Sequence, residues 1–193
     1  ITVIIGLASM VLLIYPALFK MFTKVKYIDF FKGIRPAQLL AFSTSSSSAT
    51  LPVTMKQVEQ ELGVSEEVSS FVLPLGATIN MDGTSLYQAV AAVFIAQALG
   101  LELSLGSQLM IVLTATLASI GSAGVPGAGM VMLVIVLESI GIPTAGIALI
   151  MAPDRILDMC RTVVNVTGDA AVTMVVASTE GELPDGMIRK TLL

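Results

Sequence analysis

Histidine and tryptophan are absent from the 193 residues, and Cys160 is the only cysteine. These counts exclude a His/Cys zinc site, an iron–sulfur cluster and an internal disulfide. They also exclude a Ser-His-Asp hydrolase, because no histidine can act as the general base. Charge is scarce too: 12% of residues are Asp, Glu, Lys or Arg, whereas soluble domains contain about a quarter. No nucleic-acid partner is expected.

Long uncharged stretches are what the sequence has in abundance. Hydrophobic residues make up 55% of the chain, and the mean hydropathy is +0.91. Residues 103–137 contain no charged side chain, and residues 69–101 contain only Asp82. A helix of roughly 20 such residues crosses the hydrocarbon core of a bilayer, which is about 30 Å thick. We therefore expect an all-α, multi-pass protein in the lipid bilayer of the cell membrane.

The uncharged run at residues 1–19 predicts the end of a spanning helix rather than a signal peptide, because it has no basic flank and no cleavage site. A chain that begins inside a hydrophobic run is expected to be the C-terminal part of a longer protein. Two groups of basic residues are expected in the cytoplasm by the positive-inside tendency. They are Lys20, Lys24, Lys26, Lys32 and Arg35 after this run, and Arg189 and Lys190 near the C-terminus.

Helix-breaking residues interrupt the later apolar segments in their middle. Serines compete for backbone hydrogen bonds and proline removes one, so residues 43–52 predict the tip of a helical hairpin. Glycines and a proline at residues 119–129 predict a second tip. The expected segments are a spanning helix with a cytoplasmic link at 1–33, hairpin one at 34–67, an interrupted spanning helix at 68–101, hairpin two at 102–141, a polar last span at 142–178 and a cytoplasmic tail at 179–193.

This order of segments is an internal repeat. Each half has a broken hairpin whose tip is expected to end in a proline, Pro52 or Pro126. An Asn-x-x-Gly element follows each tip, at residues 80–83 and 165–168. Inverted repeats with re-entrant hairpins and broken helices are typical of secondary transporters. Residues 34–178 are expected to form most of one transport domain.

Asp82 and Asp169 are the acidic residues expected to bind a cation. Each stands beside a glycine and near an asparagine, and carbonyls freed at a helix break supply further oxygen ligands. A buried acid in a spanning segment costs about 2.5 kcal/mol or more and usually has a function. The alternative is that either aspartate caps a helix or pairs with an arginine.

In the last span, Asp158, Arg161, Thr162 and Asn165 have i, i+3, i+4, i+7 spacing and therefore share one helical face. Such a face can hold an acidic amino acid, because Asp158 accepts the ammonium group and the planar fork of Arg161 binds a carboxylate. The alternative is an Asp158–Arg161 salt bridge that only balances two charges.

The remaining polar features predict less direct roles. Asp154 and Arg155, nearer the start of the last span, are expected at the membrane interface. Residues 121–129 are not a phosphate-binding loop, because no Gly-Lys-Ser/Thr follows. A re-entrant-loop ion channel would need symmetric carbonyl rings from identical subunits, and an intramembrane enzyme would need a base near its serines. We expect a protein that is not an enzyme and that uses no cofactor.

Four motifs carry a resemblance to a known family: residues 45–52 (SSSSATLP), 80–84 (NMDGT), 124–127 (GVPG) and 158–169 (DMCRTVVNVTGD). They resemble hairpin one, the unwound seventh helix, the tip of hairpin two and the eighth helix of the glutamate transporter family, the dicarboxylate/amino acid:cation symporters. The resemblance covers nearly the whole chain. It implies a homotrimer with an elevator-type alternating-access mechanism, in which hairpin two is the extracellular gate.

The resemblance further implies a secondary active symporter of aspartate or glutamate coupled to sodium, with a proton-coupled C4-dicarboxylate symporter of the same family as the alternative. Carried over by motif, the substrate contacts are Ser47, Thr84, Val125, Gly129, Asp158, Arg161, Thr162 and Asn165. One sodium site would use Gly76, Asn80, Asn165 and Asp169, and a second the backbone oxygens of Thr78, Met81, Ser119, Ile120 and Ser122. A third would use Asn80 and Asp82 together with an earlier helix.

Three positions depart from the family pattern. Members often carry an extra arginine before the hairpin-one serines or after the aspartate matched by Asp158, but Ser45 and Met159 occupy those places here. Arg155, expected at the interface, is the alternative candidate for this extra arginine. Gln88 stands where proton-coupled animal members carry an acid, which argues for sodium coupling without proton countertransport.

Overall fold

The computed structural model describes residues 1–183, so most of the expected tail, with Arg189 and Lys190, lies outside it. Every regular element in this part of the chain is helical, which confirms the expected all-α fold. The elements are α1 (Thr2–Ser9), the π-helical turn η1 (Met10–Ile14), α2 (Tyr15–Phe22), α3 (Tyr27–Gly33), α4 (Arg35–Thr44), α5 (Ser47–Gln60), α6 (Glu66–Ile79), α7 (Asp82–Ala98), α8 (Leu105–Ile120), α9 (Ala128–Ser139), the 3₁₀ helix η2 (Thr144–Leu149) and α10 (Met151–Thr179).

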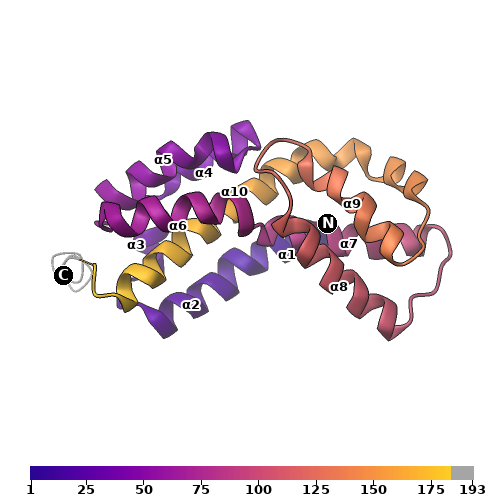
Figure 1. Cartoon of the computed structure of the whole chain (residues 1–193), viewed down its shortest axis with the longest axis horizontal. Coiled ribbons are helices and arrows are strands. Elements are labelled where there is room, and N and C mark those ends of the chain that lie inside the picture. The colour runs from indigo at the N-terminus through magenta and orange to yellow at the C-terminus, as the bar shows by residue number, and fades with distance from the viewer. Residues whose placement is uncertain (184–193) are drawn as a thin grey trace.

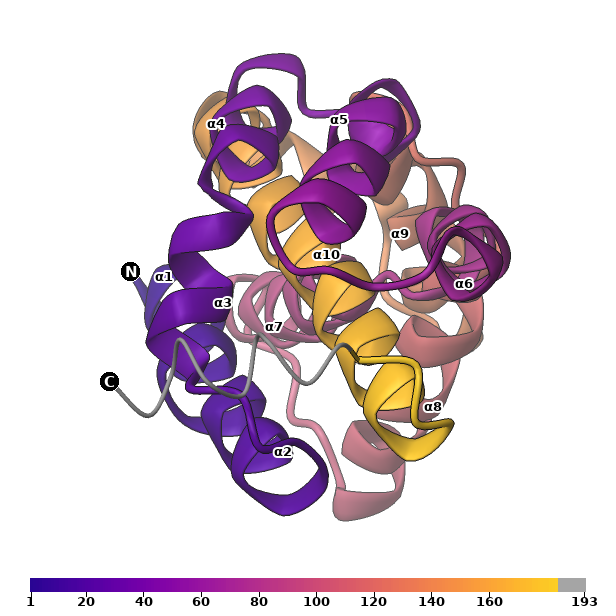
Figure 2. The same ribbon diagram turned by 90° about the vertical axis from the view of Figure 1, so that its left-hand side faces the viewer.

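Helix α10 is the central element of the fold. It runs obliquely through the molecule and packs against α2, α4, α5, α6 and α7 (Figure 1). Seen from one end, the other helices surround it (Figure 2). Helices α1 and α2 also pack on this body, through α7 and α10. Most charged side chains on α10 are therefore enclosed by protein, with Arg155 as the exposed exception.

Two helical hairpins approach the centre from opposite ends (Figure 1). The α4–α5 pair and the α8–α9 pair each fold back at a short break, and the two breaks meet: Ser46 Oγ donates a hydrogen bond of 2.7 Å to the carbonyl of Gly124. Helices α6 and α7 meet at a third break, at Asn80 and Met81. The three predicted breaks therefore converge on one region.

The break in hairpin one is shorter than residues 43–52. Ser45 adopts a left-handed conformation with φ 53°, which ends α4. Ser46 then caps α5, because its side chain accepts a hydrogen bond from the backbone N–H of Ala49 at 3.1 Å. The expectation that Pro52 ends this tip is wrong, since Pro52 lies inside α5. Pro52 lies in the second turn of α5, so the carbonyl of Ser48 loses its intrahelical donor.

Other boundaries differ from the sequence-based expectations by a turn or less. Helix α6 begins at Glu66, because Ser65 caps it and acidic residues favour a first helical turn. The basic link contains the short helix α3. The last span is divided, with η2 preceding α10.

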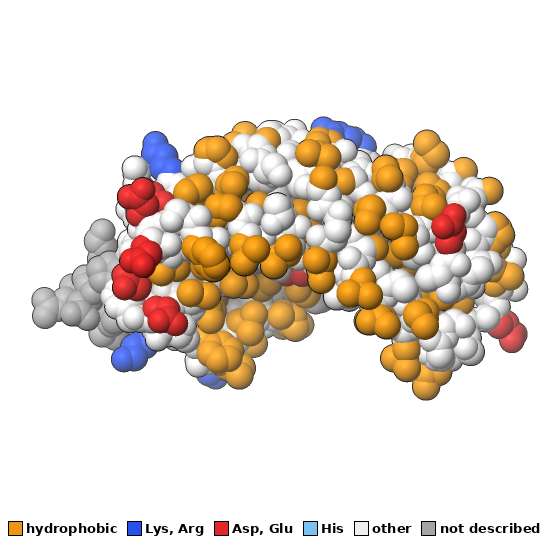
Figure 3. Space-filling view, in the orientation of Figure 1, with side chains coloured by type: hydrophobic (Ala, Val, Ile, Leu, Met, Phe, Trp, Pro, Cys, Tyr) orange, Lys and Arg blue, Asp and Glu red, His pale blue; other side chains and the backbone are white. Residues whose placement is uncertain are grey.

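The outer surface is strongly apolar. By length and composition, one helical run in residues 1–183, Thr2–Phe22, is able to cross a membrane; its mean hydropathy is 2.3 and its window is only 22% buried. The shorter helices α8 and α9 are also apolar. Apolar side chains cover the middle of the face in Figure 3, and most acidic side chains visible there lie near its two ends. Large apolar side chains that are at least two-thirds exposed include Leu12, Phe71, Leu105 and Val131. A surface of this kind needs lipid or further protein to cover it.

Candidate functional site

The polar face of α10 lies inside the molecule. Asp158, Arg161, Thr162 and Asn165 are all buried, and Arg161 is only 1% exposed. The Arg161 guanidinium donates to Asp158 Oδ1 at 2.7 Å and to Asp154 Oδ1 at 3.2 Å. The ion pair that the sequence offered as an alternative is therefore present in this structure, with a second carboxylate added. Thr162 donates within its own helix, to the carbonyl of Asp158 at 2.9 Å.

The interfacial position expected for Asp154 is wrong. Its side chain is buried and pairs with Arg161. Asp154, Asp158 and Arg161 have i, i+4, i+7 spacing and therefore lie on the same helical face. Tyr87 of α7 closes the cluster from another side, with the Arg161 Cζ atom 3.8 Å from its ring centroid. The Arg161 Nε atom is buried without a hydrogen-bond partner among the described residues. The cluster thus has an unused donor.

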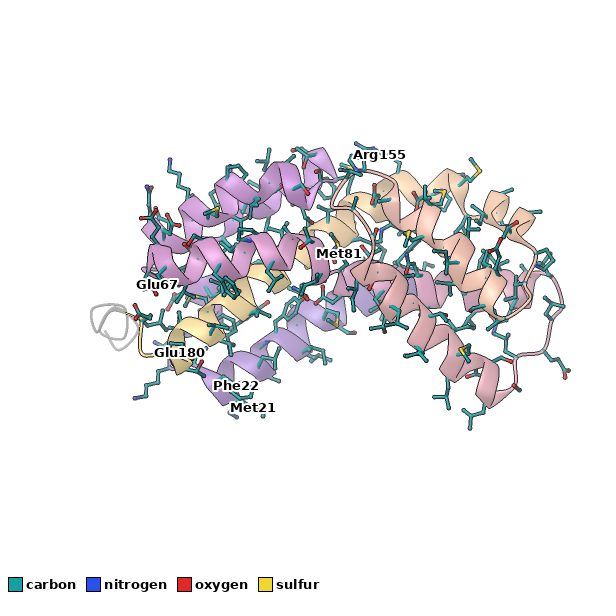
Figure 4. All side chains as sticks on the ribbon, viewed as in Figure 1. Met21, Phe22, Glu67, Met81, Arg155 and Glu180 are labelled. Atoms are coloured by element: carbon teal, nitrogen blue, oxygen red, sulfur yellow. The ribbon has the colours of Figure 1, made fainter. Side chains whose placement is uncertain are left out.

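Arg155 points the other way. It is exposed and lies at the upper edge of the view in Figure 4. Its guanidinium donates to Ser45 Oγ at 3.1 Å, so it contacts the tip of hairpin one rather than the Arg161 cluster. Arg155, the alternative candidate for an extra arginine at the site, therefore contacts only hairpin one at the edge of the site.

The break between α6 and α7 packs directly on this face of α10. Asn165 Oδ1 accepts from the backbone N–H of Gly83 at 2.8 Å, and Asn165 Nδ2 donates to Thr84 Oγ1 at 3.0 Å. Met81 lies close to Asn165 and near the middle of the molecule (Figure 4). A Cβ atom on Gly83 would lie 2.8 Å from the carbonyl oxygen of Arg161, so this approach requires glycine. Asn165 therefore connects the polar face of α10 to the break between α6 and α7.

The two candidate cation carboxylates are held differently. Asn80 Nδ2 donates to Asp169 Oδ1 at 2.9 Å, and a Cβ atom on Gly76 would lie 2.7 Å from that same oxygen. Asp82, the first residue of α7, accepts from the backbone N–H of its neighbour Gly83 at 2.9 Å, but α7 has no side-chain cap. Neither carboxylate pairs with an arginine in residues 1–183.

Hairpin two closes over the cluster. Its tip donates from the Gly127 N–H to Asp158 Oδ2 at 3.0 Å, and Gly129 is packed so that a Cβ atom would lie 3.5 Å from Arg161 Cζ. The carbonyl of Gly124 accepts from Ser46 Oγ and from the Ser48 N–H, the latter at 3.2 Å. Both hairpin tips therefore touch each other, and one of them touches Asp158.

The other predicted residues lie around this centre. Asn80, Met81, Asp82, Ser119 and Ile120 line a groove of about 440 Å³ between α7 and α8. Ser47 and Ser122 are buried in the two hairpins, whereas Val125 is 51% exposed at the tip. Thr78 is exposed, and its hydroxyl bonds the carbonyl of Leu75 at 2.7 Å.

No group of three or more His, Cys, Asp or Glu side chains with metal-binding geometry occurs in residues 1–183. The groups that contact Asp82 and Asp169 are an amide side chain, a hydroxyl and backbone atoms. Hard oxygen ligands of this kind suit alkali and alkaline-earth cations rather than zinc or copper.

Broken helices and hairpin tips that converge on buried charged side chains are typical of secondary transporters. The model of the Sodium:dicarboxylate symporter family matches residues 1–179, and the chain belongs to this family.

Curated relatives agree with this assignment. The chain is 51% identical to Excitatory amino acid transporter 5 of Mus musculus over 177 residues, which is 92% of the chain and 32% of the relative. It is 51% identical to Excitatory amino acid transporter 1 of Homo sapiens over 170 residues, 88% of the chain and 31% of the relative. An Excitatory amino acid transporter of Caenorhabditis elegans is likewise 51% identical over 170 residues. The chain thus spans about a third of the length of these relatives.

Proposed function

We propose that this chain carries the substrate and ion site of a sodium-coupled symporter for acidic amino acids. The observation that carries the proposal is Arg161, a fully buried guanidinium that lies against Gly129 of hairpin two and the ring of Tyr87 of α7. Its two aspartate partners leave the Nε donor without a partner among the described residues, and the planar guanidinium fork suits a bidentate carboxylate. Aspartate and glutamate supply such an anion in the side-chain carboxylate.

Substrate binding is an exchange of partners in this proposal. Asp154 and Asp158 form ion pairs with Arg161 in the structure, and the Gly127 N–H donates a hydrogen bond to the other oxygen of Asp158. A substrate carboxylate replaces one aspartate on the guanidinium, and the ammonium group of the substrate takes Asp158. Hairpin two must release Asp158 for this exchange, which makes its tip the gate. The substrate contacts are those carried over by motif, on Ser47, Thr84, Val125, Gly129, Asp158, Arg161, Thr162 and Asn165.

Sodium ions bind beside the substrate. Asp169, Asn80 and Gly76 touch one another, and Asn165 links the same break to the substrate face, which supports the first ion site. The groove at Met81, Ser119 and Ile120 supports the second. Asp82 belongs to a third. Sodium is therefore bound by the same α6–α7 break and hairpin that enclose the substrate, which couples the two.

The proposed working form is a homotrimer in the plasma membrane. The hairpins re-enter the bilayer from opposite sides, and residues 34–178 move as the transport domain by an elevator mechanism. The exposed apolar surface of α1, α8 and α9 supports a membrane position. The basic residues around α3 face the cytoplasm.

Uptake by the full-length protein in liposomes tests the proposal. An inward sodium gradient is expected to drive uptake of labelled aspartate, and replacement of sodium by choline is expected to stop it. Labelled serine serves as the neutral comparison. Aspartate uptake that continues at the same rate without sodium would exclude sodium coupling, and a preference for succinate driven by a proton gradient would favour the C4-dicarboxylate alternative.

Gln88 predicts that protons are not countertransported. Its side chain is fully buried in α7, and its Nε2 atom donates to the carbonyl of Gly129 at 3.0 Å. An amide keeps this donor at every pH, whereas a carboxyl group donates only while protonated. Position 88 is therefore expected to contribute no pH dependence to wild-type uptake between about pH 5.5 and pH 8.5.

Replacing Gln88 with glutamate should make uptake pH-dependent. In Gln88→Glu the protonated form keeps the bond to Gly129, and the ionised form faces its carbonyl oxygen. Uptake by this variant should fall as the pH rises. The expected decrease is about tenfold, because the ionised glutamate is a buried charge that has lost its hydrogen bond to the Gly129 carbonyl. The control is Gln97→Glu, which lies on the exposed part of the same helix. Parallel pH profiles for Gln88→Glu and wild type would contradict the role of this contact.

A further inference from the structure

Tyr15 is a buried residue for which the proposed function has no use. It is the first residue of α2 and is 3% exposed. Its hydroxyl donates a hydrogen bond to Asp82 Oδ2 and lies 3.2 Å from the carbonyl oxygen of Val164. The Tyr15 side chain therefore connects the first helical run to the α6–α7 break and to α10.

Two features of the backbone provide this contact. The π-helical turn Met10–Ile14 immediately precedes Tyr15. A π-turn inserts one residue, which turns the side chains after it by about 100° relative to a regular helix. Opposite, Gly168 leaves space: a Cβ atom there would lie 2.7 Å from the Tyr15 hydroxyl, 3.0 Å from Asn80 Nδ2 and 3.1 Å from Asp82 Oδ2. Three polar groups thus meet where any larger residue would collide.

We propose that Tyr15 is a positioning residue. Its hydroxyl donates a hydrogen bond to the Asp82 carboxylate when no cation is bound, and this bond breaks when sodium binds the carboxylate. The inference rests on the proposed function, because it takes Asp82 as a sodium ligand. Asp82 is half-buried and has no counter-ion in residues 1–183, so hydrogen-bond donors stabilise its charge. Asp82 has two in residues 1–183, the Gly83 N–H and the Tyr15 hydroxyl.

The second acceptor explains how the hydroxyl yields. When a cation takes Asp82 Oδ2, the O–H rotates toward the Val164 carbonyl, which is already within 3.2 Å. The hydroxyl keeps its proton throughout, so no proton is exchanged with either side of the membrane. Asn80 plays the matching part at Asp169, where its amide donates to the carboxylate.

Removal of the hydroxyl therefore destabilises the empty state more than the sodium-bound state. In the empty state, Tyr15→Phe loses a hydrogen bond to a charged acceptor, whereas in the bound state it loses only a neutral bond to a carbonyl. Sodium binding is expected to become tighter, by about tenfold in Kd, because the difference between those two bonds is of that order.

The experiment measures sodium binding to the full-length protein in nanodiscs without substrate, by calorimetric titration, for wild type, Tyr15→Phe and Tyr27→Phe. Tyr27 is the matched control, since its hydroxyl is also buried but has no hydrogen-bond partner in residues 1–183, and its ring packs on Phe19 and Phe30. The expected result is a lower sodium Kd for Tyr15→Phe alone. Thermal unfolding gives a second readout: Tyr15→Phe should melt below wild type in choline chloride, with a smaller difference in saturating sodium.

Two outcomes overturn the inference in distinguishable ways. An unchanged or higher sodium Kd for Tyr15→Phe, with wild type binding sodium normally, shows that the hydroxyl does not compete with the ion. A wild-type protein that neither binds sodium nor is stabilised by it removes the proposed function itself, and the inference with it.

Discussion

Replacing Arg161 with methionine is expected to lower the affinity for aspartate at least a hundredfold and to shift the preference toward neutral amino acids. Arg161 is enclosed by Asp154, Asp158 and the ring of Tyr87. Removing one partner of a buried charge network costs about 3–5 kcal/mol, and each 1.4 kcal/mol is tenfold. Competition of unlabelled aspartate and serine against labelled substrate measures the shift.

Two further variants separate recognition from folding. Arg161→Met leaves two buried carboxylates without a cation, so Asp154→Asn combined with Arg161→Met should recover thermal stability without recovering aspartate affinity. Arg155→Met is the matched control, because this arginine is exposed on the same helix and bonds only Ser45 among the described residues. An aspartate-to-serine preference that is the same in Arg161→Met and wild type would show that Arg161 only balances charge.

The parts of the site that could be predicted from the sequence depend on local spacing. Asp158, Arg161 and Asn165 share a face because helical periodicity fixes it, and the structure places all three inside. The same rule includes Asp154 at i−4 from Asp158, yet its position near the start of the span suggested the membrane interface. Sequence position was the weaker guide, because the Asp154 side chain turns inward and pairs with Arg161 although its neighbours on α10 are exposed.

The parts that could not be predicted depend on contacts between distant segments. A proline normally ends a helix, but Pro52 lies inside α5, which begins earlier, at the Ser46 cap. Tyr15 gave no sequence signal beyond one hydroxyl in an uncharged run, since its role depends on a π-helical turn and on the space left at Gly168. The meeting of Ser46 with Gly124 likewise exists only after both hairpins have folded. The assignment of individual sodium ligands stays a prediction.

The second large effect is expected at Asp169, where replacement with asparagine should abolish sodium-driven aspartate uptake. Asparagine keeps the size of the side chain and an oxygen that accepts from Asn80 Nδ2, so the contact at 2.9 Å can persist. What it removes is the negative charge, in a buried setting where a cation has few other charged ligands. The full-length variant should fold, as its thermal unfolding in choline will report, but its sodium Kd should rise by more than tenfold.

Asp29→Asn is the control for this loss of charge, because Asp29 is an exposed carboxylate on α3. Its sodium titration should match that of wild type. The comparison with Tyr15→Phe is the sharper one, because the two variants are predicted to move the sodium Kd in opposite directions from neighbouring positions: removing the charge of a ligand weakens binding, and removing the hydroxyl that competes with the ion strengthens it. If Asp169→Asn binds sodium and takes up aspartate as wild type does, the carboxylate is a structural partner of Asn80, and the ion must be bound elsewhere.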